Sequence, residues 1–263
     1  SNNTAVGRSA LTANTTGASN TAVGAFSLTS VTTGEKNSAV GRGALSDNTG
    51  SSNSAMGYNA LTSNTSASNN TAVGDSALAL NTTGTENVAV GANALDAQTT
   101  GIANTAIGFQ SLGANTTANN NTAVGRKTLL VNTTGTQNTA LGSNVLVANT
   151  TADKNTGVGY QALTSNTTGT GNVAVGANAL DANTTASNNT AVGLDAGTNV
   201  TTGADNTYLG RRAGFANSSG SNNVAIGVSS MEDANSSAEN NVCVGLRVGF
   251  ALTGDNNTAI GYE

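Results

Sequence analysis

The side chains that most often carry catalysis are scarce in this chain of 263 residues, which contains no His, one Cys and 14 acidic residues. The acidic residues never recur as a pair at one position of a motif, so no two carboxylates are placed for general acid and base chemistry. No His is present to activate Cys243 as a nucleophile. We therefore predict that the chain is not an enzyme.

The sequence also lacks the usual patterns for metals, nucleic acids and membranes. The Gly-Gly-x-Gly-x-Asp signature of calcium-binding β-rolls does not occur, and we expect neither a metal nor a cofactor. Cations pair only at Arg126-Lys127 and Arg211-Arg212, which is too little clustered charge for a nucleic-acid partner. No apolar run approaches the roughly 20 residues of a membrane span, so we expect no membrane insertion of this segment.

The residue that does recur at a fixed spacing is Asn, which stands four residues before a Gly sixteen times. Twelve of the fifteen intervals between these glycines are 17 residues, and the others are 16 or 18. Such periodicity predicts a solenoid rather than the disordered tract that the polar composition would suggest. We call these residues the marker asparagines and marker glycines. The marker asparagines are Asn3, Asn20, Asn37, Asn53, Asn70, Asn87, Asn104, Asn121, Asn138, Asn155, Asn172, Asn189, Asn206, Asn223, Asn241 and Asn257.

One repeat reads Asn-Thr-Ala-Val-Gly-x-x-Ala-Leu-x-x-Asn-Thr-Thr-Gly-x-x, as in the copy over residues 70–86. Its two apolar pieces are too short for helices, and the flanking Asn, Thr and Gly favour turns. No Asn-Gly or Asp-Gly hairpin signal occurs, which disfavours an antiparallel meander. The prediction is an all-β parallel β-roll, or β-solenoid, of 16 turns with two short strands in each turn.

Stacked asparagines can bond one another, because each side chain carries both a donor and an acceptor. We expect the marker asparagines to form a structural ladder, in which Asn104 bonds Asn87 and Asn121 in the adjacent turns. A second and looser Asn column includes Asn81, and other residues such as Val200 substitute in it. We expect this second column to form a more exposed corner.

Each apolar piece, if it is a strand, places consecutive residues on opposite sides. Ala72 and Val73 would then face opposite ways, and so would Ala77 and Leu78. A thin coil has a single interior, so the second apolar column must face something else. We predict that the coils associate through their Ala columns into a symmetric oligomer, with three chains preferred over two.

The motif resembles the Ser-Val-Ala-Ile-Gly repeats of the YadA-like head of trimeric autotransporter adhesins, and also repeats of bacterial and phage trimeric fibre proteins. The resemblance rests on Asn-Thr-Ala-Val-Gly and its variants over residues 104–108 and 223–227, and it covers the whole chain. It implies a left-handed parallel β-roll, trimerised side by side in an extracellular fibre. The 17-residue period is longer than that of the adhesin heads, so we expect an enlarged outer loop at Asn-Thr-Thr-Gly.

Aromatic residues directly follow several marker glycines, among them Tyr58, Phe109 and Tyr160. They are candidate surface contacts for a glycan or a host receptor, although aromatic side chains at such positions more often pack along neighbouring corners. Several Arg residues share this corner, where solvated charge is the usual explanation.

The repeats divide the chain into residues 1–195, where the pattern is steady, and residues 196–263, where Gly197, Gly214 and Gly249 replace Leu. We expect the variant repeats to lead towards a downstream segment outside this sequence, with drift of the repeats as the alternative. Cys243 stands where most copies have Ala, and we expect a small buried side chain there.

The leading functional hypothesis is a structural and adhesive fibre segment on a cell surface, an appendage or a virion, with the chain itself as partner in a homotrimer or a longer fibre. A second hypothesis is an ice-binding solenoid, which is motivated by regular Thr columns and would work as a monomer. A third is a mechanical spacer with no ligand.

Overall fold

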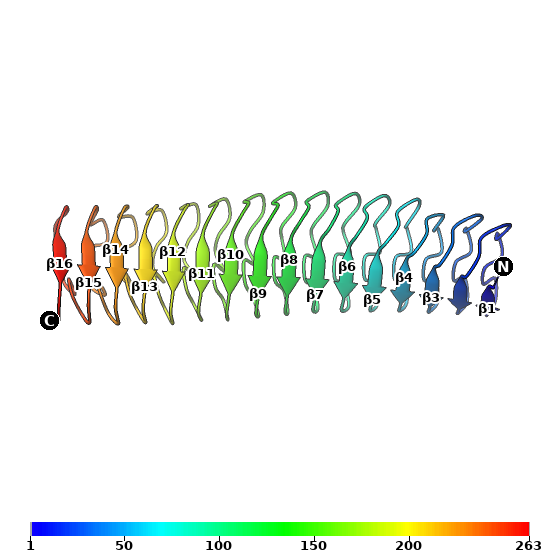
Figure 1. Ribbon diagram of the computed structural model, residues 1–263, viewed down its shortest axis with the longest axis horizontal. Coiled ribbons are helices and arrows are strands. Elements are labelled where there is room, and N and C mark those ends of the chain that lie inside the picture. Colours follow the sequence, from blue (N-terminus) through cyan, green and yellow to red (C-terminus); the bar gives the residue numbers. More distant parts are fainter. Residues whose placement is uncertain (1, 263) are drawn as a thin grey trace. The chain divides into compact units, whose positions relative to one another are not determined.

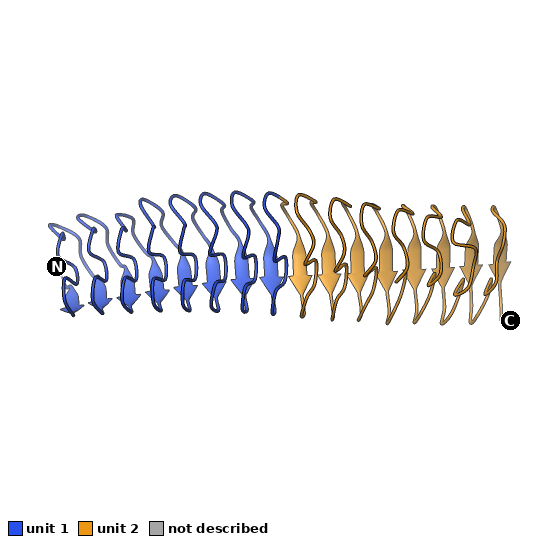
Figure 2. Ribbon diagram, turned by 180° about the vertical axis from the view of Figure 1, so that it is seen from behind, with its two compact units in different colours: residues 1–134 blue, residues 135–263 orange. Residues whose placement is uncertain are grey.

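The computed structural model describes residues 2–262, and the chain divides into two compact units, residues 1–134 and 135–263 (Figure 2). Every regular element in residues 2–262 is a short β-strand. Each unit is a parallel β-solenoid, in which every turn adds one strand beside the strand of the preceding turn (Figure 1). The predicted all-β parallel solenoid of about sixteen turns is therefore confirmed.

The first unit contains eight strands, each paired in parallel with the next along the chain. Equivalent residues of neighbouring repeats lie opposite one another, as Thr71 lies opposite Val88 and Ala72 opposite Ala89. The strands are β1 (Thr4–Val6), β2 (Thr21–Val23), β3 (Ser38–Val40), β4 (Ser54–Met56), β5 (Thr71–Val73), β6 (Val88–Val90), β7 (Thr105–Ile107) and β8 (Thr122–Val124).

The second unit repeats this arrangement with eight further strands in the same register. Ala174, for example, lies opposite Ala191. The strands are β9 (Thr139–Leu141), β10 (Thr156–Val158), β11 (Val173–Val175), β12 (Thr190–Val192), β13 (Thr207–Leu209), β14 (Val224–Ile226), β15 (Val242–Val244) and β16 (Thr258–Ile260).

Each turn contains one strand, so the prediction of two strands per turn is wrong. The second apolar piece is a run of turns in which Ser76 (φ 54°) and Leu78 (φ 55°) adopt left-handed backbone angles. It still joins neighbouring turns, because the Leu78 N–H donates to the Ala94 carbonyl at 2.9 Å. The alternation of sides that an extended strand imposes does not apply to such a backbone.

The interior of the coil holds only a few small side chains from each turn. Ala72, Ala77 and Leu78 are all fully buried, whereas Val73 is 37% exposed. The prediction that Ala72 and Val73 face opposite ways is confirmed, and the same prediction for Ala77 and Leu78 is wrong. The Ala columns line the inside of the coil, so the prediction that chains associate through them is also wrong.

Small residues occupy the inner column because the strand backs directly onto the opposite wall of its own coil. Where Gly157 replaces the inner Ala, Val145 replaces the Ala that faces it, and a Cβ at residue 157 would lie 2.5 Å from Val145 Cγ1. A larger side chain on one wall of the coil therefore occurs only where the residue that faces it is smaller, as close packing requires.

The same exchange of volume explains why Gly replaces Leu at residues 197 and 214, where Tyr208 fills the space. Tyr208 replaces the inner Ala of β13 and is fully buried. A Cβ at Gly214 would lie 2.2 Å from the Tyr208 ring, and one at Gly197 would lie 2.8 Å from it. At the third change, a Cβ on Gly249 would lie 2.5 Å from Cys243 Sγ. The variant repeats thus keep the strand register and change only which positions contribute the large side chains of the core.

The marker glycines allow the closest approach of one turn to the next. Gly74 has φ 137°, and a Cβ there would lie 2.6 Å from both the carbonyl carbon and the carbonyl oxygen of Gly91. No rearrangement of a side chain can relieve an overlap with backbone atoms. Only Gly fits both the backbone angle and the space.

We expect Gly74→Ala to destabilise the chain by at least about 2 kcal/mol, because it combines an unfavourable backbone angle with overlap between turns. Chemical denaturation monitored by circular dichroism measures the change. Gly113→Ala is the matched control, because a Cβ at Gly113 meets its nearest neighbours at an ordinary 3.5 Å. Equal stability of the two variants would contradict the role given to the marker glycines.

Candidate functional site

The first candidate surface is the outer side of the strands, which we call the strand face. It consists of the first and third residues of each strand, since the middle residue points inward. The first position holds Thr, Ser or Val, and the third holds Val, Ile, Leu or Met. None of the sixteen strands in residues 2–262 contains a charged residue.

The third position of this face exposes apolar side chains along both units. Met56 is 54% exposed in the first unit, and Leu141 is 48% exposed in the second. Eight strands of three residues each cover on the order of 400 Å² in each unit, at about 4.8 Å between strands and 3.3 Å per residue. The apolar third-position column makes up about half of this face, and an exposed apolar column that recurs in every turn is a candidate interaction site. The sequence carried a signal for this surface, namely the absence of charge from these positions.

The second candidate surface is the glycine corner, which we define as the two residues that follow each marker glycine. The predicted contact residues Tyr58, Phe109 and Tyr160 lie there, and each is about half exposed (48%, 45% and 53%). Arg42 from the preceding turn lies 5.4 Å from the Tyr58 ring centroid and donates from Nη1 to the Tyr58 hydroxyl at 3.0 Å. Tyr58 therefore contacts a neighbouring corner and also remains accessible.

Other cations pair with rings at or beside the glycine corner. The Arg8 guanidinium lies 4.4 Å from the Phe26 ring centroid, one turn further along. In the second unit Arg212 stacks on Phe215 at 4.3 Å and also forms an ion pair with Glu232 at 2.9 Å. Stacking of this kind holds a guanidinium in place and leaves it charged.

The marker asparagines form the predicted ladder within each unit. Asn104 contacts both neighbours, because its Nδ2 donates to Asn87 Oδ1 at 3.3 Å and its Oδ1 accepts from the Asn121 backbone N–H at 3.0 Å. The shorter bonds run from side chain to backbone, as in the Asn104 Nδ2 bond to the Ala118 carbonyl at 2.7 Å. Asn104 therefore binds a donor and an acceptor of the following turn, and Asn20 and Asn70 do the same. The ladder is a structural feature of the interior.

The second Asn column is buried, so the prediction of a more exposed corner is wrong. Asn81 Nδ2 donates to the Gly84 carbonyl at 2.9 Å and to Asn64 Oδ1 at 2.8 Å, so the side chain closes its corner from inside. Where the column is interrupted, an amide oxygen loses its partner. Asn183 Oδ1 is buried without a hydrogen-bond partner at the turn where Val200 stands next in the column.

The chain's single thiol, that of Cys243, is fully buried, which confirms the expected small interior side chain. Burial raises the pKa of this thiol, because the apolar surroundings disfavour the thiolate. Within residues 2–262, no group of three or more His, Cys, Asp or Glu side chains is placed to hold a metal ion.

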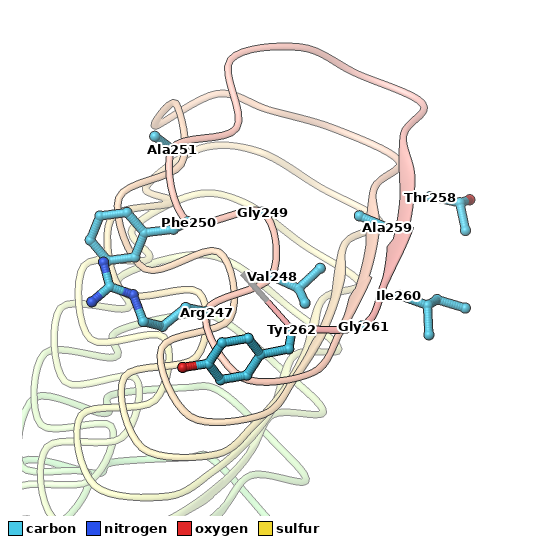
Figure 3. Close-up of a pocket in the computed structure, with 10 residues that line it drawn as sticks. All are labelled: Arg247, Val248, Gly249, Phe250, Ala251, Thr258, Ala259, Ile260, Gly261 and Tyr262. Carbon is cyan, nitrogen blue, oxygen red and sulfur yellow. The ribbon is translucent and has the colours of Figure 1, made fainter.

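A cavity of about 550 Å³ lies between β16 and the segment over residues 247–251 (Figure 3). Val248 and Ala259 contribute apolar side chains, and Arg247 and Tyr262 contribute polar groups, whereas the Ile260 side chain points away from the coil. Arg247 stacks on Phe250 at 4.4 Å from the ring centroid. The cavity gathers no set of convergent polar side chains that would suit a specific small ligand.

In comparisons with known proteins, no family model and no curated protein matches this chain. The resemblance to adhesin heads remains a prediction. Residues 2–262 contain no helix with the length and apolar character that crossing a membrane requires.

We expect Asn172→Ala to lower the free energy of unfolding by about 1–3 kcal/mol, since it leaves the buried Asn189 N–H without its partner and removes one of the two side-chain bonds to the Ala186 carbonyl. Thermal and chemical denaturation measure the loss. Asn199→Ala is the control, because Asn199 is exposed. A marker variant as stable as this control would show that the ladder does not hold the turns together.

We expect Val200→Asn to stabilise the chain by about 1 kcal/mol, because the new amide can donate to the unpartnered Asn183 Oδ1 and to its own corner. Val200→Ala, which removes volume without adding a donor, should destabilise it. Melting temperatures of the two variants and the parent chain give the comparison. A lower melting point for Val200→Asn than for Val200→Ala would contradict the role of the second column.

Proposed function

We propose that the chain is a structural and adhesive segment of an extracellular fibre, in which copies associate side by side through the strand face. The observation that carries the proposal is this face, which is free of charge in every described strand and exposes apolar side chains in both units. Apolar sheet surfaces of this kind are ordinarily covered in soluble assemblies.

A second copy of the chain is the partner that the strand face fits best. Three copies with their strand faces turned towards one axis would each bury on the order of 400 Å² in each unit. Equal repeats on parallel copies would bring like columns together within each unit. Closed symmetry would satisfy every copy, and three copies around one axis agree with the resemblance to trimeric fibres.

Ice binding is the competing use of the same face, since it is flat and carries a column of Thr hydroxyls. Variation within the columns favours protein as the partner. Val88 and Val173 replace the Thr of the first position, and Met56 and Leu141 enlarge the third position. Packing against a protein tolerates such changes, whereas a lattice of ordered water calls for a uniform face. A mechanical spacer without a ligand would use the same assembly.

Light scattering of the purified chain tests this proposal, with three times the chain mass of 25.6 kDa expected. Ile107→Lys places a charge on the strand face and should lower the mass to that of one chain, because burial of an unpaired charge is unfavourable. Leu80→Lys is the matched control, since Leu80 is exposed and apolar but lies off the strand face.

A parent chain whose light-scattering mass is that of one copy would refute the assembly. An equal decrease of the measured mass in the two Lys variants would refute it as well. Thermal hysteresis and ice shaping by that single copy would then identify the ice-binding alternative. A trimer that persists in Ile107→Lys would place the interface on another surface.

A further inference from the structure

We infer that the glycine corner of residues 1–134 binds an acidic polysaccharide, a linear chain of sugars that carries carboxylate or sulfate groups. The inference rests on the proposed role in attachment and names the ligand class and the edge that receives it. The strand face is reserved for other copies of the chain, and the glycine corner is a separate surface.

Charge is segregated around the first unit. Its glycine corner carries four cations and a single carboxylate, that of Asp75, whereas the rest of the unit carries one cation, Lys36, and four carboxylates. The corner is therefore positive within a chain of formal net charge −5. The corner cations are Arg8, Arg42, Arg126 and Lys127. A cationic edge on an otherwise acidic surface attracts anions selectively.

Aromatic rings share this edge with the cations. Tyr58 follows Arg42 by one turn, and Phe109 precedes Arg126 by one turn. Both rings are nearly half exposed. An aromatic face offers a partner to the C–H groups of a sugar ring, and the adjacent guanidinium can bind a carboxylate or sulfate through two parallel hydrogen bonds. The two rings lie about 14 Å apart, three turns at roughly 4.8 Å each.

The corner is rigid before any ligand arrives. The backbone N–H groups of Asn59, Gln110 and Lys127 donate to carbonyls of the preceding turn at 2.9–3.1 Å. Asn59 and Gln110 also place amide groups along the same edge, where sugar hydroxyls can bond them. Binding to a surface that is already ordered loses little conformational entropy.

The density of charge favours a polysaccharide over a nucleic acid. Seven steps between eight turns span roughly 34 Å, and a nucleic-acid strand of that length carries about ten phosphates at 3.4 Å each. The edge offers four cations against them. A polysaccharide with an acidic group on only some of its sugars is more sparsely charged and suits the alternation of rings and cations.

Calorimetric titration of the 263-residue chain with hyaluronate, which carries a carboxylate on every second sugar, tests the inference. We expect saturable binding that weakens with added salt, and no binding of neutral dextran. The double variant Arg42→Ala/Arg126→Ala should bind about tenfold more weakly. Asp75→Asn should bind about threefold more tightly, because it removes the one carboxylate from the edge.

Lys36→Ala is the matched control, since it removes a cation from a different edge of the same unit. Failure of the parent chain to bind hyaluronate would overturn the inference. An equal loss of affinity for the polysaccharide in Lys36→Ala and in the double variant would also overturn it. So would a higher affinity of the parent chain for single-stranded oligothymidylate than for the polysaccharide. Tyr58→Ala/Phe109→Ala should weaken binding without changing its dependence on salt, and unchanged affinity would remove the rings from the site.

Light scattering on the same samples separates this inference from the proposed assembly. A trimer that binds no hyaluronate overturns the proposed ligand and leaves the assembly intact. A single copy that binds hyaluronate overturns the assembly and leaves the ligand site intact.

Discussion

The architecture of each unit depends on one interaction, in which the carboxamide of a marker Asn binds both a backbone donor and a backbone acceptor of the following turn. Asn155, for example, accepts from the Asn172 N–H and donates to the Gly169 carbonyl. Backbone groups at a buried corner are costly to leave unpaired, and the strands are too short to pair them. Repetition of this bond fixes the register of the turns and allows every column of like residues to form.

The thin interior follows from this register and limits what the sequence can change. The inner column of each strand faces the opposite wall of its own coil, so a larger residue on one side requires a smaller one on the other. Tyr208 with Gly197 and Gly214 is one such exchange, and Val145 with Gly157 is another. The middle residue of each strand points into this narrow core, and alternation along the strand places the third-position Val or Leu on the outer surface.

The two candidate surfaces differ because the repeat constrains them differently. Strand positions are extended and in register, and they contain only small polar or apolar side chains in every described turn. At the glycine corner the backbone is equally fixed, but the side chains point into solvent and vary from turn to turn. Cations, rings and a carboxylate can therefore be distributed there without disturbing the stack. Self-association suits the uniform surface, and recognition of a ligand suits the variable one.

The sequence alone determined the solenoid, its period and the marker ladder, because a fixed phase of Asn and Gly allows only in-register stacking of turns. It also placed Tyr58, Phe109 and Tyr160 on an accessible corner and Cys243 in the interior. The tertiary structure decided the path of the chain between the strands. Leu78 and its equivalents adopt left-handed angles that residue preferences disfavour, and only the hydrogen bonds and packing of neighbouring turns stabilise them. That path turns Ala77 and Leu78 inward together, buries the second Asn column and leaves Val, rather than Ala, on the outside.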